Sequence, residues 1–361
     1  MFSDGSAEDM DSNSDWFTKG PVSPIDAVSI SRRVNLSALN KKRILITGAQ
    51  GLIGNYLAQA LAEAMLAQGL SPLTLFLQSR RTLDHRQSWT SQLKFVEHLH
   101  FPLDFSEVFP PVDVIVHAAS PASPSKYNSP ESLYIPNISG IVTALSLSQV
   151  PERQLFISSG EVYGLHTESL RSSEINPRFQ SSGPRADYPN AKLVAEKLLL
   201  DARFSGSRFN VARLFHTFGP GLSENDGRSF ADFLHTAAKH KTLTLYSTGH
   251  DVRNFAYIED SVAGLLQILV SENDGQVFDV AGPSRLTIRE FAEVVADLSG
   301  EEIVFEDTSA QRGRTPITGY PPIPSTQALM ALGWSAQISL EEGARRTLEF
   351  IQATLASRKT E

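Results

Sequence analysis

The sequence predicts an α/β fold of the Rossmann type, with a doubly wound parallel sheet and a smaller, discontinuous α/β lobe. Short apolar runs that are typical of buried strands alternate with segments whose apolar residues recur at helical spacing. A glycine-rich turn, Gly48-x-x-Gly51-x-x-Gly54, joins the first such run to the first helical segment. At 361 residues, the chain is long enough to bury a large core.

The predicted elements follow in order along the first 214 residues. Strands are expected at 43–47, 73–77, 114–117, 155–158 and 210–214, with a further strand ahead of residue 104. Helices are expected at 51–67, around 138–149 and at 188–204. Apolar strands that alternate with helices imply a parallel sheet covered on both faces.

The chain divides into three parts by its composition and by the alternation of predicted strands and helices. Residues 1–40 form an acidic, polar and partly disordered arm that carries no catalytic pattern. Residues 41–214 and 257–280 are assigned to a dinucleotide-binding domain. In residues 215–256 and 281–361 glycine and proline recur, which indicates a smaller lobe over the carboxyl ends of the strands, where ligands bind in such sheets.

Composition narrows the classes of function. The net charge of −8 argues against a nucleic-acid partner, because phosphate binding needs a concentrated basic surface. The absence of cysteine excludes disulfides, zinc-thiolate sites and a thiol nucleophile, and we expect no metal site. The sequence shows no secretory signal and no apolar run long enough to span a bilayer, so we expect a cytoplasmic protein without a membrane partner.

The glycine-rich turn predicts a dinucleotide cofactor. In this context Gly48 allows the tight turn, Gly51 admits the pyrophosphate, and Gly54 lets helix and strand pack closely. A simple structural turn is the alternative. The expected cofactor-binding residues are Gly48, Gly51, Leu52, Ile53 and Gly54 in the turn, Asp104 and Phe105 beside the adenine, and the small residues Ala118, Ala119 and Ser120.

The end of the second strand bears on the choice between NAD and NADP. An acid there usually contacts the ribose hydroxyl of NAD, whereas an arginine accommodates the extra phosphate of NADP. Here the segment is Gln78-Ser79-Arg80-Arg81 and contains no carboxylate, so Arg80 and Arg81 favour NADP. The alternative is that both arginines are simply solvated.

Tyr188 and Lys192 are the candidate catalytic pair. Residues four apart lie on one face of a helix, and a cation beside a phenol lowers the pKa of the phenol. Ser159 ends a predicted strand upstream, and could hydrogen-bond a reacting hydroxyl. A chance Tyr–Lys pair and a helix-capping serine are the structural alternatives.

These motifs resemble the extended short-chain dehydrogenase/reductase family, whose members act on nucleotide sugars, from about residue 41 to residue 334. Within that family the chain looks like UDP-glucuronate decarboxylases, on these segments: His117-Ala-Ala-Ser-Pro-Ala-Ser-Pro124, Gly183-Pro-Arg-Ala-Asp-Tyr188, Phe215-His-Thr-Phe-Gly-Pro220, Asn225-Asp-Gly-Arg228 and Arg253-Asn-Phe-Ala-Tyr-Ile258. The resemblance implies a sheet of about seven strands, bound NAD, a UDP-linked sugar and a homodimer.

The resemblance also implies roles for individual residues. It makes Ser159, Tyr188 and Lys192 the hydride-transfer group, and Glu161 the acid beside the reacting carbons. The expected substrate-binding residues are Arg185, His216, Arg228 and Arg253. The chain departs from the family in having His216 where relatives usually have Asn, and in lacking the acid after the second strand.

The reaction type depends on Glu161 and its neighbour. All of the family reactions begin by oxidising the sugar 4-hydroxyl. A 4,6-dehydratase carries an Asp immediately before the Glu, but this chain has Gly160, which favours decarboxylation. A 4-epimerase needs no such Glu. An NADPH-dependent keto-sugar reductase and a non-catalytic dinucleotide sensor are the remaining alternatives.

Overall fold

A seven-stranded parallel sheet forms the centre of the computed structural model, which describes residues 22–70, 74–80, 90, 93–100, 110–122, 129–146, 150–181, 186–202, 206–306 and 320–358. The strand order is β10-β6-β5-β4-β1-β2-β3. The order reverses direction on either side of β1, as expected for a doubly wound sheet. The predicted fold class and strand number are confirmed.

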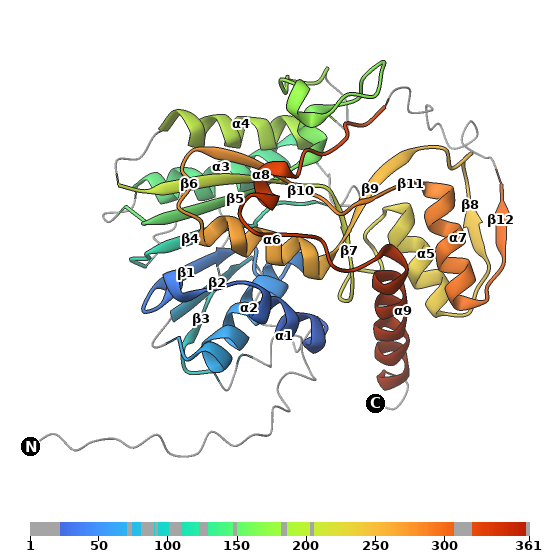
Figure 1. Cartoon of the computed structure of the whole chain (residues 1–361), viewed down its shortest axis with the longest axis horizontal. Helices are drawn as coiled ribbons and strands as arrows, with labels where there is room; N and C mark the ends of the chain where they lie inside the picture. Colours follow the sequence, from blue (N-terminus) through green and yellow to red (C-terminus); the bar gives the residue numbers. More distant parts are fainter. Residues whose placement is uncertain are drawn as a thin grey trace, which may run out of the picture.

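Six of the seven strands lie at or close to the expected positions, and β10 is the strand whose position was not predicted. The strands are β1 (Arg43–Thr47), β2 (Thr74–Ser79), β3 (Val96–His100), β4 (Val114–His117), β5 (Arg153–Ser159), β6 (Arg208–Leu214) and β10 (Gln276–Val280). Helices α3 (Pro130–Ser146) and α4 (Asp187–Ala202) cover one face, and α2 (Leu52–Gln68) and α6 (Ile258–Val270) cover the other (Figure 1). Helix α3 begins earlier than predicted, because a proline is well accommodated in the first turn of a helix.

A second group of elements lies beside the sheet (Figure 1). Its three-stranded sheet contains β7 (His216–Phe218), β9 (Val252–Tyr257) and β11 (Ser284–Thr287), and a two-stranded sheet contains β8 (Leu243–Leu245) and β12 (Ile303–Phe305). Its helices are α5 (Ser229–Ala238), α7 (Ile288–Ser299) and α9 (Leu340–Ser357), with α8 (Gln327–Met330) near β10. Buried aromatic rings fill the space between them, and Phe255 and Phe291 have centroids 4.5 Å apart. Short 3₁₀ turns complete the chain: η2 (Ser37–Leu39), η5 (Gly160–Tyr163) and η6 (Ser172–Glu174).

The described part of the amino-terminal arm contains helix α1 (Pro24–Arg33), which packs on α2 and α6. Ser23 caps the helix by accepting a hydrogen bond from the backbone N–H of Asp26. Arm and domain thus share one core, since Ile30 and Leu36 are fully buried in it.

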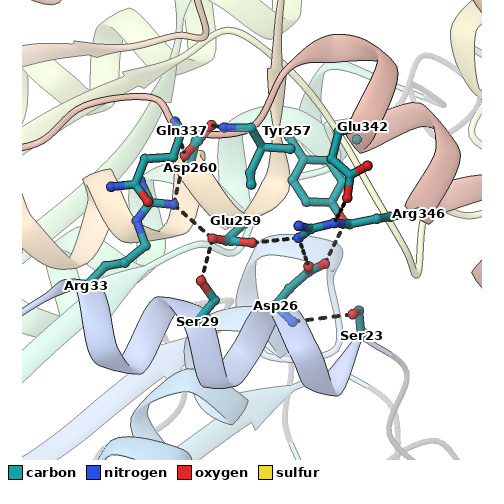
Figure 2. A network of polar contacts seen from close by, with 12 residues as sticks. Ser23, Asp26, Ser29, Arg33, Tyr257, Glu259, Asp260, Gln337, Glu342 and Arg346 are labelled. Carbon is teal, nitrogen blue, oxygen red and sulfur yellow. Dashed lines mark hydrogen bonds and ion pairs between the residues drawn. The ribbon is translucent and has the colours of Figure 1, made fainter.

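A buried ionic network ties α1 to the start of α6 and to α9 (Figure 2). Arg33 lies 3.0 Å from Glu259 and 2.8 Å from Asp260, and Arg346 lies 3.1 Å from Asp26 and 3.0 Å from Glu259. We call the five residues Asp26, Arg33, Glu259, Asp260 and Arg346 the α1–α9 clamp. Because it joins three elements far apart in sequence, the clamp fixes the arm and the last helix on the same body.

The described residues contain neither a membrane-spanning helix nor a metal-binding cluster. None of their helices is both long enough and apolar enough to cross a membrane. No group of three or more His, Cys, Asp or Glu side chains among them is arranged to hold a metal ion.

Candidate active site

The glycine-rich turn lies between β1 and α2 and fits closely against the end of β4. Gly48 has a φ of +66° and donates its N–H to the Gln78 side-chain oxygen at 3.1 Å. A Cβ on Gly48 would lie 2.6 Å from the Cα of Ala119, and a Cβ on Gly54 would lie 2.5 Å from the carbonyl oxygen of Gly48. The turn therefore requires glycine both for its conformation and for its packing.

The small residues after β4 are held beside this turn by buried polar contacts. Thr47 Oγ1 accepts the N–H of Ala119 at 3.3 Å and lies 2.8 Å from Nδ1 of His117. The other ring nitrogen, Nε2, lies 3.0 Å from the carbonyl oxygen of Pro136, so His117 donates there and accepts from Thr47. Burial lowers the pKa of His117 to about 3, so the ring is neutral. His117 thus orients Thr47, which in turn holds the backbone of Ala119, a role that sequence analysis did not assign.

The other predicted cofactor residues divide by location. Leu52 and Ile53 occupy the first turn of α2, half-buried against the core. Arg80 is exposed just after β2, while Gln78 is buried and bonds the glycine turn. Arg81, Asp104 and Phe105 lie outside the described residues.

The structure brings Ser159, Glu161 and Tyr188 together. Ser159 is the last residue of β5, Glu161 lies exposed in η5, and Tyr188 is buried in the first turn of α4. Burial raises the pKa of Tyr188 well above its usual range, and the negative charge of Glu161 raises that pKa further. A hydrogen bond from Ser159 and the charge of Arg228 act in the opposite direction. A carboxylate and a hydroxyl therefore both act on the phenol, as a proton-transfer site requires.

Lys192 lies one turn beyond Tyr188 and is also buried. Its ammonium group donates to the carbonyl oxygen of Ile157 at 2.7 Å and lies 4.8 Å from the centre of the Phe156 ring. Burial lowers the pKa of Lys192 to about 7, and the negative charge of Glu196 opposes this shift. In this structure the groups that lower the pKa of Tyr188 are Ser159 and Arg228, whereas the sequence spacing pointed to Lys192.

Of the charged residues in the second group of elements, Arg228 acts on this cluster, since its charge lowers the pKa of Tyr188. His216 in β7 is surrounded edge-on by Phe230 and Phe255, and burial lowers its pKa to about 3, with smaller effects from Arg253 and Arg228. Arg228 pairs with Asp226, with Nη2 at 2.8 Å from Oδ2. Three of the predicted substrate-binding residues, His216, Arg228 and Arg253, are therefore close enough to influence one another, whereas Arg185 lies outside the described residues.

Sequence analysis missed a set of buried polar residues behind the cluster. They are Tyr163, Glu196, Arg213 and Asp279. The available signal was a charged residue inside an apolar strand, since Arg213 interrupts β6 and Asp279 interrupts β10.

A nucleotide-binding sheet with a Ser–Tyr–Lys cluster at the carboxyl ends of its strands defines a dinucleotide-dependent enzyme of the Rossmann class. The model of the NAD dependent epimerase/dehydratase family matches residues 44–281. The chain belongs to this family.

Curated relatives and solved structures agree with this assignment. The chain is 33% identical over 330 residues to UDP-glucuronic acid decarboxylase 1 of Xenopus tropicalis, covering 89% of this chain and 74% of that protein. It is 32% identical over 314 residues to UDP-glucuronic acid decarboxylase 6 of Arabidopsis thaliana, covering 83% and 86%. A UDP-glucuronic acid 4-epimerase from Bacillus cereus, solved with UDP-glucuronic acid and NAD, superposes with a TM-score of 0.70 at 19% identity, covering 86% and 99% of the two chains. At that identity the superposition supports the fold.

Proposed function

We propose that this protein is an NAD-dependent UDP-glucuronate decarboxylase. The observation that carries the proposal is the position of Glu161, whose charge acts on the buried Tyr188, with Gly160 beside it. A Cβ on Gly160 would lie 2.7 Å from the ring of Phe215, so a larger residue fits there only if that ring moves. The position that is acidic in a 4,6-dehydratase is thus occupied here by glycine, packed directly against the ring of Phe215. The two decarboxylases that are 32–33% identical to this chain support the same reading.

The residues at the glycine turn fit a dinucleotide. Ala119 lies so close to Gly48 that a side chain would not fit at position 48. Helix α2 begins at Leu52, just after the turn, so the amino end of α2 is available to a pyrophosphate. We propose that the cofactor contacts Gly48, Gly51, Leu52, Ile53, Gly54, Arg80, Asp104, Phe105, Ala118, Ala119, Ser120, Tyr188 and Lys192. When bound, NAD supplies a reversible hydride acceptor at the sugar.

The catalytic residues then have distinct tasks. Tyr188, as the phenolate, takes the proton of the sugar 4-hydroxyl as hydride leaves carbon 4, and Ser159 hydrogen-bonds the oxygen that becomes the ketone. The C5 carboxylate is now that of a β-keto acid, so the bond from C5 to the carboxylate breaks and its electrons form an enolate. Glu161 is exposed to water, so its carboxylate takes up a proton from solvent and delivers that proton to carbon 5. Return of the hydride to carbon 4 and of the proton from Tyr188 completes the cycle.

The second group of elements is proposed to hold the sugar nucleotide. We assign residues 41–214 and 257–280 to the cofactor and residues 215–256 and 281–361 to the substrate. Arg185, Arg228 and Arg253 would bind the diphosphate or the sugar, because guanidinium groups match phosphate oxygens bidentately. His216 is neutral in this structure, so it would contact the substrate as a hydrogen-bonding group without a charge.

Product analysis tests the proposed function. Incubation of the protein with UDP-glucuronate, followed by ¹H NMR, should show a UDP-pentose that accumulates without net consumption of NAD. A UDP-hexuronate epimerised at carbon 4 would instead identify a 4-epimerase. A 4-keto-6-deoxy product from a hexose nucleotide would identify a dehydratase, and stoichiometric oxidation of NADPH would identify a reductase.

We also propose that the protein acts in the cytoplasm as a homodimer, as the family resemblance implies. Size-exclusion chromatography with light scattering should then give twice the chain mass of 39.5 kDa. Elution at the mass of a single chain would contradict this assembly.

A further inference from the structure

A row of buried polar side chains crosses three neighbouring strands behind the candidate active site. Ser158 of β5 is in register with Arg213 of β6, and Arg213 is in register with Asp279 of β10. Ser158, Arg213 and Asp279 are 2%, 8% and 5% exposed. Aligned residues on adjacent strands share one face of the sheet, so the three side chains lie side by side.

Helix α4 adds a carboxylate to one end of this row. Glu196, which is 1% exposed, accepts from Nε of Arg213 at 3.1 Å and from Nη2 at 2.6 Å. It also accepts a hydrogen bond from the hydroxyl of Ser158. Glu196 lies one helical turn after Lys192, and its charge raises the pKa of that lysine against the effect of burial. The row is therefore joined to α4, the helix that carries Tyr188 and Lys192.

The turn that carries Glu161 connects to the other end of the row. The phenol of Tyr163, the last residue of η5, donates to Oδ1 of Asp279 at 2.7 Å, and the Arg213 guanidinium lies 4.7 Å from the centre of its ring. Asp279 Oδ2 accepts from the hydroxyl of Ser172 and from the N–H of Ser325 at 3.0 Å. Tyr163 is thus fixed by a carboxylate that is itself held by two further donors.

Glu161 lies between two fixed points. The hydroxyl of Ser159 accepts its N–H at 3.2 Å, and its carbonyl oxygen accepts from Gln180 Nε2 at 2.6 Å. With Tyr163 anchored two residues later, the backbone of η5 is held on both sides of Glu161 while its side chain stays exposed.

Stability alone does not account for the buried polar residues in this row. Buried ion pairs contribute little net stability, because desolvation offsets their attraction, and apolar residues of similar volume would often serve as well. Here the Arg213 guanidinium pairs with Glu196, while burial raises the pKa of Asp279 and the charge of Arg213 only partly opposes that rise. Burying these charges therefore costs desolvation free energy. The contacts they make connect the segments that carry Ser159, Glu161 and Lys192.

We propose that Tyr163, Glu196, Arg213 and Asp279 are positioning residues, which hold Glu161 and Ser159 in place against Tyr188. The proposal rests on the proposed function for the role of Glu161. It predicts that a substitution of Tyr163 lowers kcat only because it displaces Glu161.

A double-mutant cycle tests this coupling. Tyr163→Phe removes one hydroxyl, and we expect kcat to fall about tenfold, with KM within about twofold of the wild type, because small misplacements of catalytic groups are costly. In a Glu161→Gln background, the same substitution should change kcat by less than about twofold, since coupled residues are not additive. The matched control is Tyr257→Phe, which removes the phenol that donates to Asp26 at 2.6 Å in the α1–α9 clamp. It should leave kcat within about twofold of the wild type.

Amide hydrogen exchange provides a readout that needs no substrate. Tyr163→Phe should speed exchange in residues 160–166 and leave the α1–α9 clamp unchanged, and Ser172→Ala should have a smaller effect in the same segment. If the wild type does not decarboxylate UDP-glucuronate, the proposed function fails while the exchange data still decide this inference. Unchanged exchange in residues 160–166, or a kcat loss that multiplies with Glu161→Gln, would overturn it.

Discussion

In the proposed reaction, Tyr188 carries out the proton transfer. Its burial and the nearby charge of Glu161 both favour the protonated phenol, whereas Ser159 and Arg228 favour the phenolate. The groups that favour ionisation therefore have to outweigh burial at the moment of proton transfer. A positively charged nicotinamide ring would add to their effect when the cofactor is bound.

Replacement of this phenol should remove the activity without removing the cofactor. We expect Tyr188→Phe to lower kcat about 10²- to 10⁴-fold, because a positioned acid–base group contributes about that much. NAD binding, followed by fluorescence titration, should stay within about threefold of the wild type, since binding energy is spread over many contacts. Full activity of the variant would contradict the assignment.

Gly48 offers a second residue-scale prediction with a matched control. Gly48→Ala and Gly69→Ala both place a Cβ on a left-handed backbone, at φ of +66° and +64°, but only position 48 has neighbouring atoms within 4 Å. Both variants should lose about 1 kcal/mol of stability from the backbone conformation. Only Gly48→Ala should weaken NAD binding, by about tenfold or more, which isothermal titration can measure. Equal NAD affinity in the two variants would show that the turn does not cradle the cofactor.

At the scale of elements, the α1–α9 clamp makes a testable claim about the arm. Arg346 is three-quarters buried and pairs with both Asp26 and Glu259, so Arg346→Met leaves two buried carboxylates short of a partner. We expect a loss of about 2–4 kcal/mol in the free energy of unfolding, measured by urea denaturation.

The neighbouring residue supplies the control for this loss. Arg345 pairs with Glu342 and Glu349 on the exposed side of α9, where ion pairs are screened by solvent. Arg345→Met should leave the urea midpoint unchanged. Similar midpoints for the two variants would mean that the clamp does not hold α1 and α9 together.

The elements differ in how far the sequence could predict them. β1, β4 and β6 were predicted because buried strands of a parallel sheet are continuous apolar runs bounded by turns. The same local signals pointed to Ser159, the last residue of β5, and to Tyr188 and Lys192 in the first two turns of α4. The clamp and the polar row behind η5 were missed, because Asp26 meets Arg346 and Tyr163 meets Asp279 only after the chain has folded. Pairings across such separations leave no periodic pattern in one sequence.

The whole molecule should lose stability in mild acid. Burial lowers the folded-state pKa of His117 and His216 to about 3, whereas an unfolded histidine titrates near pH 6.5. Below about pH 6.5 the unfolded state therefore binds more protons, and stability falls as the pH drops toward 3, by up to about 1.4 kcal/mol per pH unit for each histidine.

Denaturation at about pH 7 and about pH 5 measures this dependence. His117→Asn should reduce the difference in unfolding free energy between the two pH values. The exposed His250 is the control, because folding does not bury its side chain, and His250→Asn should leave the difference unchanged. A pH dependence that is the same in the wild type and in His117→Asn would contradict the account of the buried ring.

The central claim is that oxidation of the sugar 4-hydroxyl, with Tyr188 as the base, and decarboxylation beside Glu161 occur in one site. The most direct measurement is the release of labelled carbon dioxide from UDP-glucuronate that carries ¹⁴C in its carboxylate. The account predicts one labelled carbon dioxide for each UDP-pentose formed by the wild type, with no net change in NADH, and neither product from Tyr188→Phe. Retention of all the label in a UDP-hexuronate would contradict it.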